Sequence, residues 1–106
     1  MEKQKITEVL VYLGIKRSLN GFDYIVKCVE YEIKENKSIN RCIHMVADDI
    51  GCNPAAVERC IRTAIDGCIM PDEARKRLFG NQKMTTAIFI KTVASCIKDD
   101  MFPAKM

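Results

Sequence analysis

The side chains best able to recognise another molecule by hydrogen bonding gather in one short segment, residues 57–65, which reads VERCIRTAI. Glu58 can accept a hydrogen bond from cytosine N4, and Arg59 can donate two to guanine O6 and N7. The next turn of a helix here would carry Arg62, within reach of a base or a phosphate. Ala55 is small enough to touch a thymine methyl group. The candidate contacts to base edges are therefore Ala55, Glu58, Arg59 and Arg62.

Two other interpretations of the charged side chains need no DNA. Glu58 and Arg62 are four residues apart, so they could form a solvated ion pair worth only a few tenths of a kcal/mol. Asp48 and Asp49 are more typical of a solvated pair than of an acid–base site. The sequence has no Ser/His/Asp or Cys/His set and no glycine-rich phosphate loop. We therefore expect neither an enzyme nor a cofactor.

Small and apolar residues around this segment predict a helix-turn-helix at about residues 39–69. Two helices can cross closely at Ala47, because its side chain is small. Gly51 falls where the chain must turn with a positive φ, which glycine adopts freely. Val57 would anchor the second helix against the first. The wedge between the two helices is predicted to be filled by Val46, Ile50 and Cys52.

The start of the second helix of this motif is marked by two residues. Asn53 can cap the helix, and Pro54 suits its first position, where no N–H is needed. A helix N-terminus also attracts phosphate, and the first helix of such a motif crosses the DNA backbone. The candidate contacts to the DNA backbone are Ser38, Asn40, Arg41, Asn53 and Thr63.

Apolar residues recur at helical spacing along most of the chain, and no stretch alternates long enough to predict a strand. This favours an all-α domain of six helices. Gly14 ends the first helix, and Ile33 completes the apolar stripe of the second. The fourth helix begins at Pro54, is stopped by Pro71, and buries Cys60 and Cys68. The predicted caps of the second, third, fifth and sixth helices are Asn20, Ser38, Asp72 and either Thr85 or Thr86.

Length and charge limit the function further. With 106 residues, 48% of them apolar, the chain is expected to be one folded domain. It has no apolar run of the roughly 20 residues that span a membrane, and its start does not resemble a signal peptide, so we expect a cytoplasmic protein. The net charge is only +3, and its excess lies in residues 72–91. Any affinity for DNA must therefore depend on how charges are sorted between faces.

The six cysteines contain no C-x-x-C pair. We expect them to be small buried side chains in a reducing compartment, with Cys60 and Cys68 on one apolar helix face. A metal site could use Cys42 and His44, but neither has a second ligand at a usual spacing. The apolar core looks sufficient without a disulfide framework.

The segment at residues 57–65 resembles the recognition helix of the C-terminal effector domain of stage zero sporulation protein A, the master regulator of sporulation. The family pattern is V-E-R-A-I-R-x-A-I, and Cys60 replaces one alanine. The similarity covers roughly residues 6–98. The other matching segments are ITEVLVYLG at 6–14, GFDY at 21–24, Ser38-Ile39 and LFG at 78–80.

This resemblance implies a six-helix domain that binds double-stranded DNA as a transcription factor, often as self-associating copies on tandem sites. It implies that Glu58 and Arg59 meet base edges and that Arg62 meets DNA. It also implies that surface near the last two helices contacts a second copy or the sigma factor of RNA polymerase.

The chain departs from the family pattern in three places. Ala55-Ala56 stands where Ser-Arg is usual, and the connection at 81–84 is short. No receiver domain is present, so the chain is either a cut-out effector domain or a stand-alone paralogue. An alternative function follows from the near-neutral motif and from Ala55-Ala56. In that alternative, the chain is a helical protein–protein interaction module that keeps the helix-turn-helix scaffold.

Overall fold

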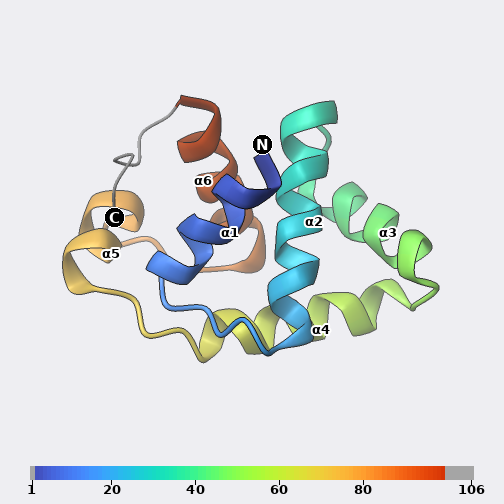
Figure 1. Cartoon of the computed structure of the whole chain (residues 1–106), viewed down its shortest axis with the longest axis horizontal. Helices are drawn as coiled ribbons and strands as arrows, with labels where there is room; N and C mark the ends of the chain where they lie inside the picture. Colours follow the sequence, from blue (N-terminus) through green and yellow to red (C-terminus); the bar gives the residue numbers. More distant parts are fainter. Residues whose placement is uncertain (1, 100–106) are drawn as a thin grey trace.

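Six α-helices follow one another along residues 2–99, the part of the chain that this computed structural model describes (Figure 1). No strand occurs among these residues, so the predicted all-α, six-helix fold is confirmed. No helix in the described part is long and apolar enough to cross a membrane. The helices are α1 Glu2–Tyr12, α2 Asn20–Glu35, α3 Ile39–Ile50, α4 Pro54–Asp66, α5 Asp72–Phe79 and α6 Thr86–Asp99.

The turn between α3 and α4 depends on Gly51, as predicted. Gly51 has φ 71°, in the left-handed region that glycine enters without strain. The next amide, of Cys52, donates to the carbonyl of Ala47 at 2.9 Å, which closes the end of α3. Gly14 adopts a similar φ of 87° just after α1. Cys52 itself is exposed, so its predicted place in the wedge between the helices was wrong; Gly51 carries the chain to the surface there.

Side-chain caps form at the predicted starts of the third and sixth helices, as well as at the start of α4, which is described below. The hydroxyl oxygen of Ser38 accepts from the amide of Arg41 at 3.2 Å and caps α3. The hydroxyl oxygen of Thr85 accepts from the amide of Ile88 at 3.1 Å at the start of α6. Helices α3 and α6 therefore begin where the sequence predicted.

Asn20 and Asp72 are not caps, because each is already the first residue of its helix. The carbonyl of Leu19 accepts from the amide of Phe22, and the carbonyl of Pro71 accepts from the amide of Arg75. Each helix therefore starts one residue earlier than expected. Neither Leu19 nor Pro71 offers a side-chain acceptor, so both helices begin without a side-chain cap.

The fourth helix is shorter than predicted. It ends at Asp66, where the amide of Gly67 donates to the carbonyl of Thr63 at 3.1 Å. Cys68 therefore lies beyond the helix, does not share a helical face with Cys60, and is half-buried. Cys60 is also only half-buried. The predictions that α4 runs on to Pro71 and buries both cysteines were wrong.

Helix α2 is the centre of the molecule. It runs through the middle of Figure 1 and packs against α1, α3, α4 and α6. It approaches α4 closely at Gly21, where a Cβ atom would lie 2.2 Å from the carbonyl oxygen of Cys60 and 2.9 Å from the Cβ of Ala64. Only glycine fits at this distance. The α2–α4 crossing therefore fixes the orientation of α4, the second helix of the helix-turn-helix.

The C-terminal half of α2 buries a carboxylate rather than the predicted isoleucine. Glu32 is 3% exposed, whereas Ile33 is only half-buried. The carboxylate lies 3.1 Å from Nζ of Lys98 and 3.6 Å from Nζ of Lys91, both on α6. Because a buried carboxylate is costly without a partner, the two lysines offset part of the cost of burying Glu32.

A polar contact joins α2 to α3. The hydroxyl of Tyr31 donates a short hydrogen bond to the carboxylate of Asp49. This bond, together with burial and the neighbouring carboxylates, raises the pKa of Tyr31 to about 12. The phenol therefore stays protonated at neutral pH and remains a donor. The central helix α2 thus supplies the hydrogen-bond donor that holds α3, the first helix of the helix-turn-helix.

The cysteines fit the expectation of small buried side chains only in part. Cys28, Cys42 and Cys96 are buried, and burial raises the pKa of each of these thiols, that of Cys28 to about 12. All six are free. In the described range, no three His, Cys, Asp or Glu side chains come together as metal ligands would.

Candidate nucleic-acid interface

Helix α4 has one buried face and one exposed face. Val57, Ile61 and Ala64 have no exposed surface and hold the helix against the core. Glu58 and Arg59 are exposed. Spacing alone predicted this division, because residues three and four apart share a helical face. The exposed side also carries Ala55 and Thr63, while Arg62 is intermediate.

The start of α4 is capped as predicted. The side-chain oxygen of Asn53 accepts from the amide of Ala55 at 2.7 Å, and Pro54 occupies the first turn. The backbone oxygen of Asn53 accepts from the amides of Ala56 and Val57 at 3.0 and 3.1 Å. These first amides are therefore already bonded within the chain. What remains for a phosphate is the positive end of the helix dipole and the amide nitrogen of the Asn53 side chain.

Arg62 is engaged inside the protein. Its guanidinium donates to Asp66 Oδ1 from Nη2 at 2.7 Å and from Nε at 3.0 Å. Nη2 also donates to the carbonyl of Met84 at 2.9 Å, just before α6. Across residues 2–99 no ion pair joins Arg62 to Glu58. The solvated Glu58–Arg62 ion pair considered from the sequence therefore does not form, and Arg62 pairs with Asp66 instead. The hydrogen bond from Arg62 lowers the pKa of Asp66.

Replacing Arg62 with glutamine should therefore destabilise the fold as well as weaken any DNA contact. We expect the free energy of unfolding to fall by about 1 kcal/mol, because the Met84 carbonyl loses a charged donor. The matched variant Asp66→Asn keeps the bond to Met84 and should change stability less. Urea unfolding of the three proteins measures this. Equal stability of Arg62→Gln and the parent would show that the Met84 contact contributes nothing.

The candidate backbone contacts Ser38, Asn40 and Arg41 lie together at the N-terminal end of α3, and all three are exposed. The α4 start lies at the opposite end of α3. Because α3 has 12 residues and a helix rises about 1.5 Å per residue, the two ends are about 18 Å apart. This span exceeds the roughly 12 Å width of the major groove. The two ends could therefore meet the backbone on either side of one groove.

One basic residue near α4 was missed among the sequence candidates. Lys83 is exposed and precedes Met84, whose carbonyl is bonded to Arg62. That bond brings the short connection before α6 beside the C-terminal half of α4. The only signal in the sequence was the excess of positive charge in residues 72–91, which does not say where those residues lie.

One known protein family covers most of the chain. The family described as "Sporulation initiation factor Spo0A C terminal" matches residues 6–97. The chain belongs to this family. The match includes most of α1, all of α2 to α5, and nearly all of α6. No individual curated protein matches the chain with significance.

The Spo0A C-terminal family consists of DNA-binding effector domains of sporulation regulators. Membership confirms the resemblance noted in residues 57–65. The α3–α4 helix-turn-helix is consistent with this family. The family is one of regulatory domains rather than of enzymes.

Proposed function

We propose that this member of the Spo0A C-terminal family is a sequence-specific DNA-binding regulator of transcription that reads the major groove with α4. The observation that carries the proposal is the exposed face of α4. There Arg59 makes no ion pair or hydrogen bond within residues 2–99, so its guanidinium is free to bind a guanine. The tight turn at Gly51 and the buried face of α4 hold this helix, and with it Arg59, in place.

In this proposal the candidate contact residues of the motif have definite roles. Arg59 and Glu58 read base edges, and Ala55 allows close approach to a thymine methyl group. Arg62 reaches the DNA only if it leaves Asp66 or shares the guanidinium with it. The residues proposed to bind backbone phosphates are Ser38, Asn40, Arg41, Asn53, Thr63 and, from the connection before α6, Lys83.

The small number of proposed phosphate contacts bears on which partners the protein needs. A few phosphate contacts give weak binding by one copy, so we propose that copies associate on tandem DNA sites. The sigma factor of RNA polymerase is a further proposed partner for the surface near α5 and α6. The protein would then act in the cytoplasm, where the chromosome lies.

Selection of bound fragments from random double-stranded DNA tests the proposal. The expected result is an enriched motif, with half-sites spaced by the separation of two bound copies. Failure to enrich any sequence at low salt would refute it. A stable protein partner found under those conditions would then favour an interaction module. The bond that occupies Arg62 would fit that alternative, because it leaves fewer cations to meet DNA.

A further inference from the structure

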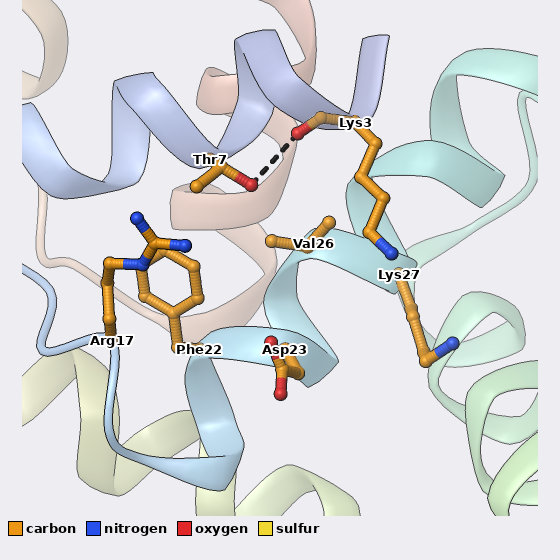
Figure 2. Close-up of a pocket in the computed structure, with 7 residues that line it drawn as sticks. All are labelled: Lys3, Thr7, Arg17, Phe22, Asp23, Val26 and Lys27. Carbon is orange, nitrogen blue, oxygen red and sulfur yellow. Dashed lines mark hydrogen bonds between the residues drawn. The ribbon is translucent and has the colours of Figure 1, made fainter. Parts of the chain in front are cut away.

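A second group of charges lies away from the exposed face of α4, in a pocket between α1 and the first half of α2 (Figure 2). The pocket has a volume of about 340 Å³, which falls within the range of small-ligand sites, roughly 300–1,000 Å³. Phe22 and Val26 supply its apolar lining and are themselves buried. The proposed DNA contacts use none of the residues that line this pocket.

Three positive side chains are among the residues that line this pocket. Arg17 lies on one side, and Lys3 and Lys27 lie on the other, with Val26 between the two groups (Figure 2). Among residues 2–99 none of the three forms an ion pair. Asp23 adds the one negative charge of the lining, so three positive charges and one negative leave a net +2. An anion placed between the cations would lower their mutual repulsion.

Arg17 is partly preorganised for this role. Its guanidinium carbon lies 5.9 Å from the centre of the Phe22 ring, a cation–π distance that restrains the side chain over the pocket wall. A restrained donor loses less conformational freedom when it binds a ligand. The planar fork of arginine also suits two oxygens of one phosphate, and lysine binds phosphate as a point charge.

We infer that this pocket binds a small phosphomonoester that also carries hydroxyl groups, the chemistry of a sugar phosphate. A phosphomonoester has a charge of about −1.5 to −2 at pH 7, which matches the net charge of the lining. The carboxylate of Asp23 can accept a hydrogen bond from a hydroxyl group of the same molecule. A DNA backbone phosphate carries only one negative charge and would leave part of the positive charge unmatched.

Titration with ribose 5-phosphate, followed by the amide NMR spectrum, tests this inference. We expect saturable shifts at the lining residues of α1, at Arg17 and in the first half of α2, and none with neutral ribose. Arg17→Gln and Lys27→Gln should each weaken binding about tenfold or more, because each removes a charged donor. The control Lys37→Gln changes an exposed lysine that is not part of the lining and should bind like the parent.

Several outcomes would overturn the inference. One is equal binding by the parent, Arg17→Gln and Lys27→Gln. Another is loss of binding in Lys37→Gln, which would indicate general charge attraction. Equal affinity for a dinucleotide without a terminal phosphate would assign the pocket to the DNA backbone instead. Arg17 touches Phe22, so Arg17→Gln could perturb folding. Lys27→Gln gives the independent answer, and urea unfolding of each variant shows that it is folded.

Discussion

Gly21→Ala should lower the free energy of unfolding by about 2–4 kcal/mol, which corresponds to a fall of roughly 10–20 °C in melting temperature. The added Cβ would lie 2.2 Å from the carbonyl oxygen of Cys60. That oxygen belongs to the α4 backbone, so it cannot rotate away as a side chain would. Alanine is favoured over glycine in a helix by up to about 1 kcal/mol, and this gain is too small to offset the overlap.

Gly67→Ala is the matched control, because Gly67 caps the C-terminal end of α4. Its φ is −93°, and the nearest atom to an added Cβ would be the carbonyl oxygen of Thr63 at 3.5 Å. We expect its stability to change by less than about 1 kcal/mol. Urea and thermal unfolding of the two variants give the comparison. If both unfold at the same midpoint as the parent, the two helix backbones do not touch at Gly21.

Arg59→Ala should reduce affinity for the selected DNA site by about 10- to 150-fold and relax base preference at one position. The reason is the loss of two hydrogen bonds to one guanine. Its effect on folding should be small, since the side chain is exposed and has no partner within residues 2–99. Arg59→Lys keeps the positive charge but not the planar guanidinium that donates two parallel hydrogen bonds. It should therefore retain non-specific binding and still lose base preference.

Arg41→Ala separates base reading from phosphate binding. Arg41 is exposed at the start of α3, so its loss should weaken binding to all sequences alike. It should also lower the slope of log affinity against log salt by about one unit. Gel-shift titrations with the selected site and with random DNA, at several salt concentrations, measure both effects. If Arg59→Ala bound both DNAs as the parent does, α4 would not be the reading helix.

Local sequence signals predicted the helix-turn-helix because its chemistry is local. A glycine at the turn, an asparagine before a proline, and apolar residues at helical spacing act within a few residues of one another. Asn53, Pro54 and Gly51 each occupy the role that such rules assign. The same reasoning placed Arg59 on the exposed face of α4. Membership of a DNA-binding family supports the proposal that this face contacts DNA.

Features that depend on distant contacts were not predictable in this way. Glu32 looks like a surface residue until α6 brings Lys91 and Lys98 beside it. Arg62 looks free until the Met84 carbonyl, 22 residues further on, comes within 2.9 Å. Gly21 looks like an ordinary position in a helix start until α4 crosses it. In each case the partner lies on a distant part of the chain, and the spacing of residues in the sequence does not predict where that part packs.

If the protein reads DNA with α4 as proposed, the pairing of Arg62 with Asp66 also affects how fast it finds its site. With that pair closed, the exposed side of α4 carries Glu58 and Arg59 as its other charges. The helix as a whole would then attract random DNA only weakly. Each encounter with a wrong sequence would be brief, because few counterions are released. The search would then proceed mostly by diffusion through solution between short visits, with little sliding along the duplex.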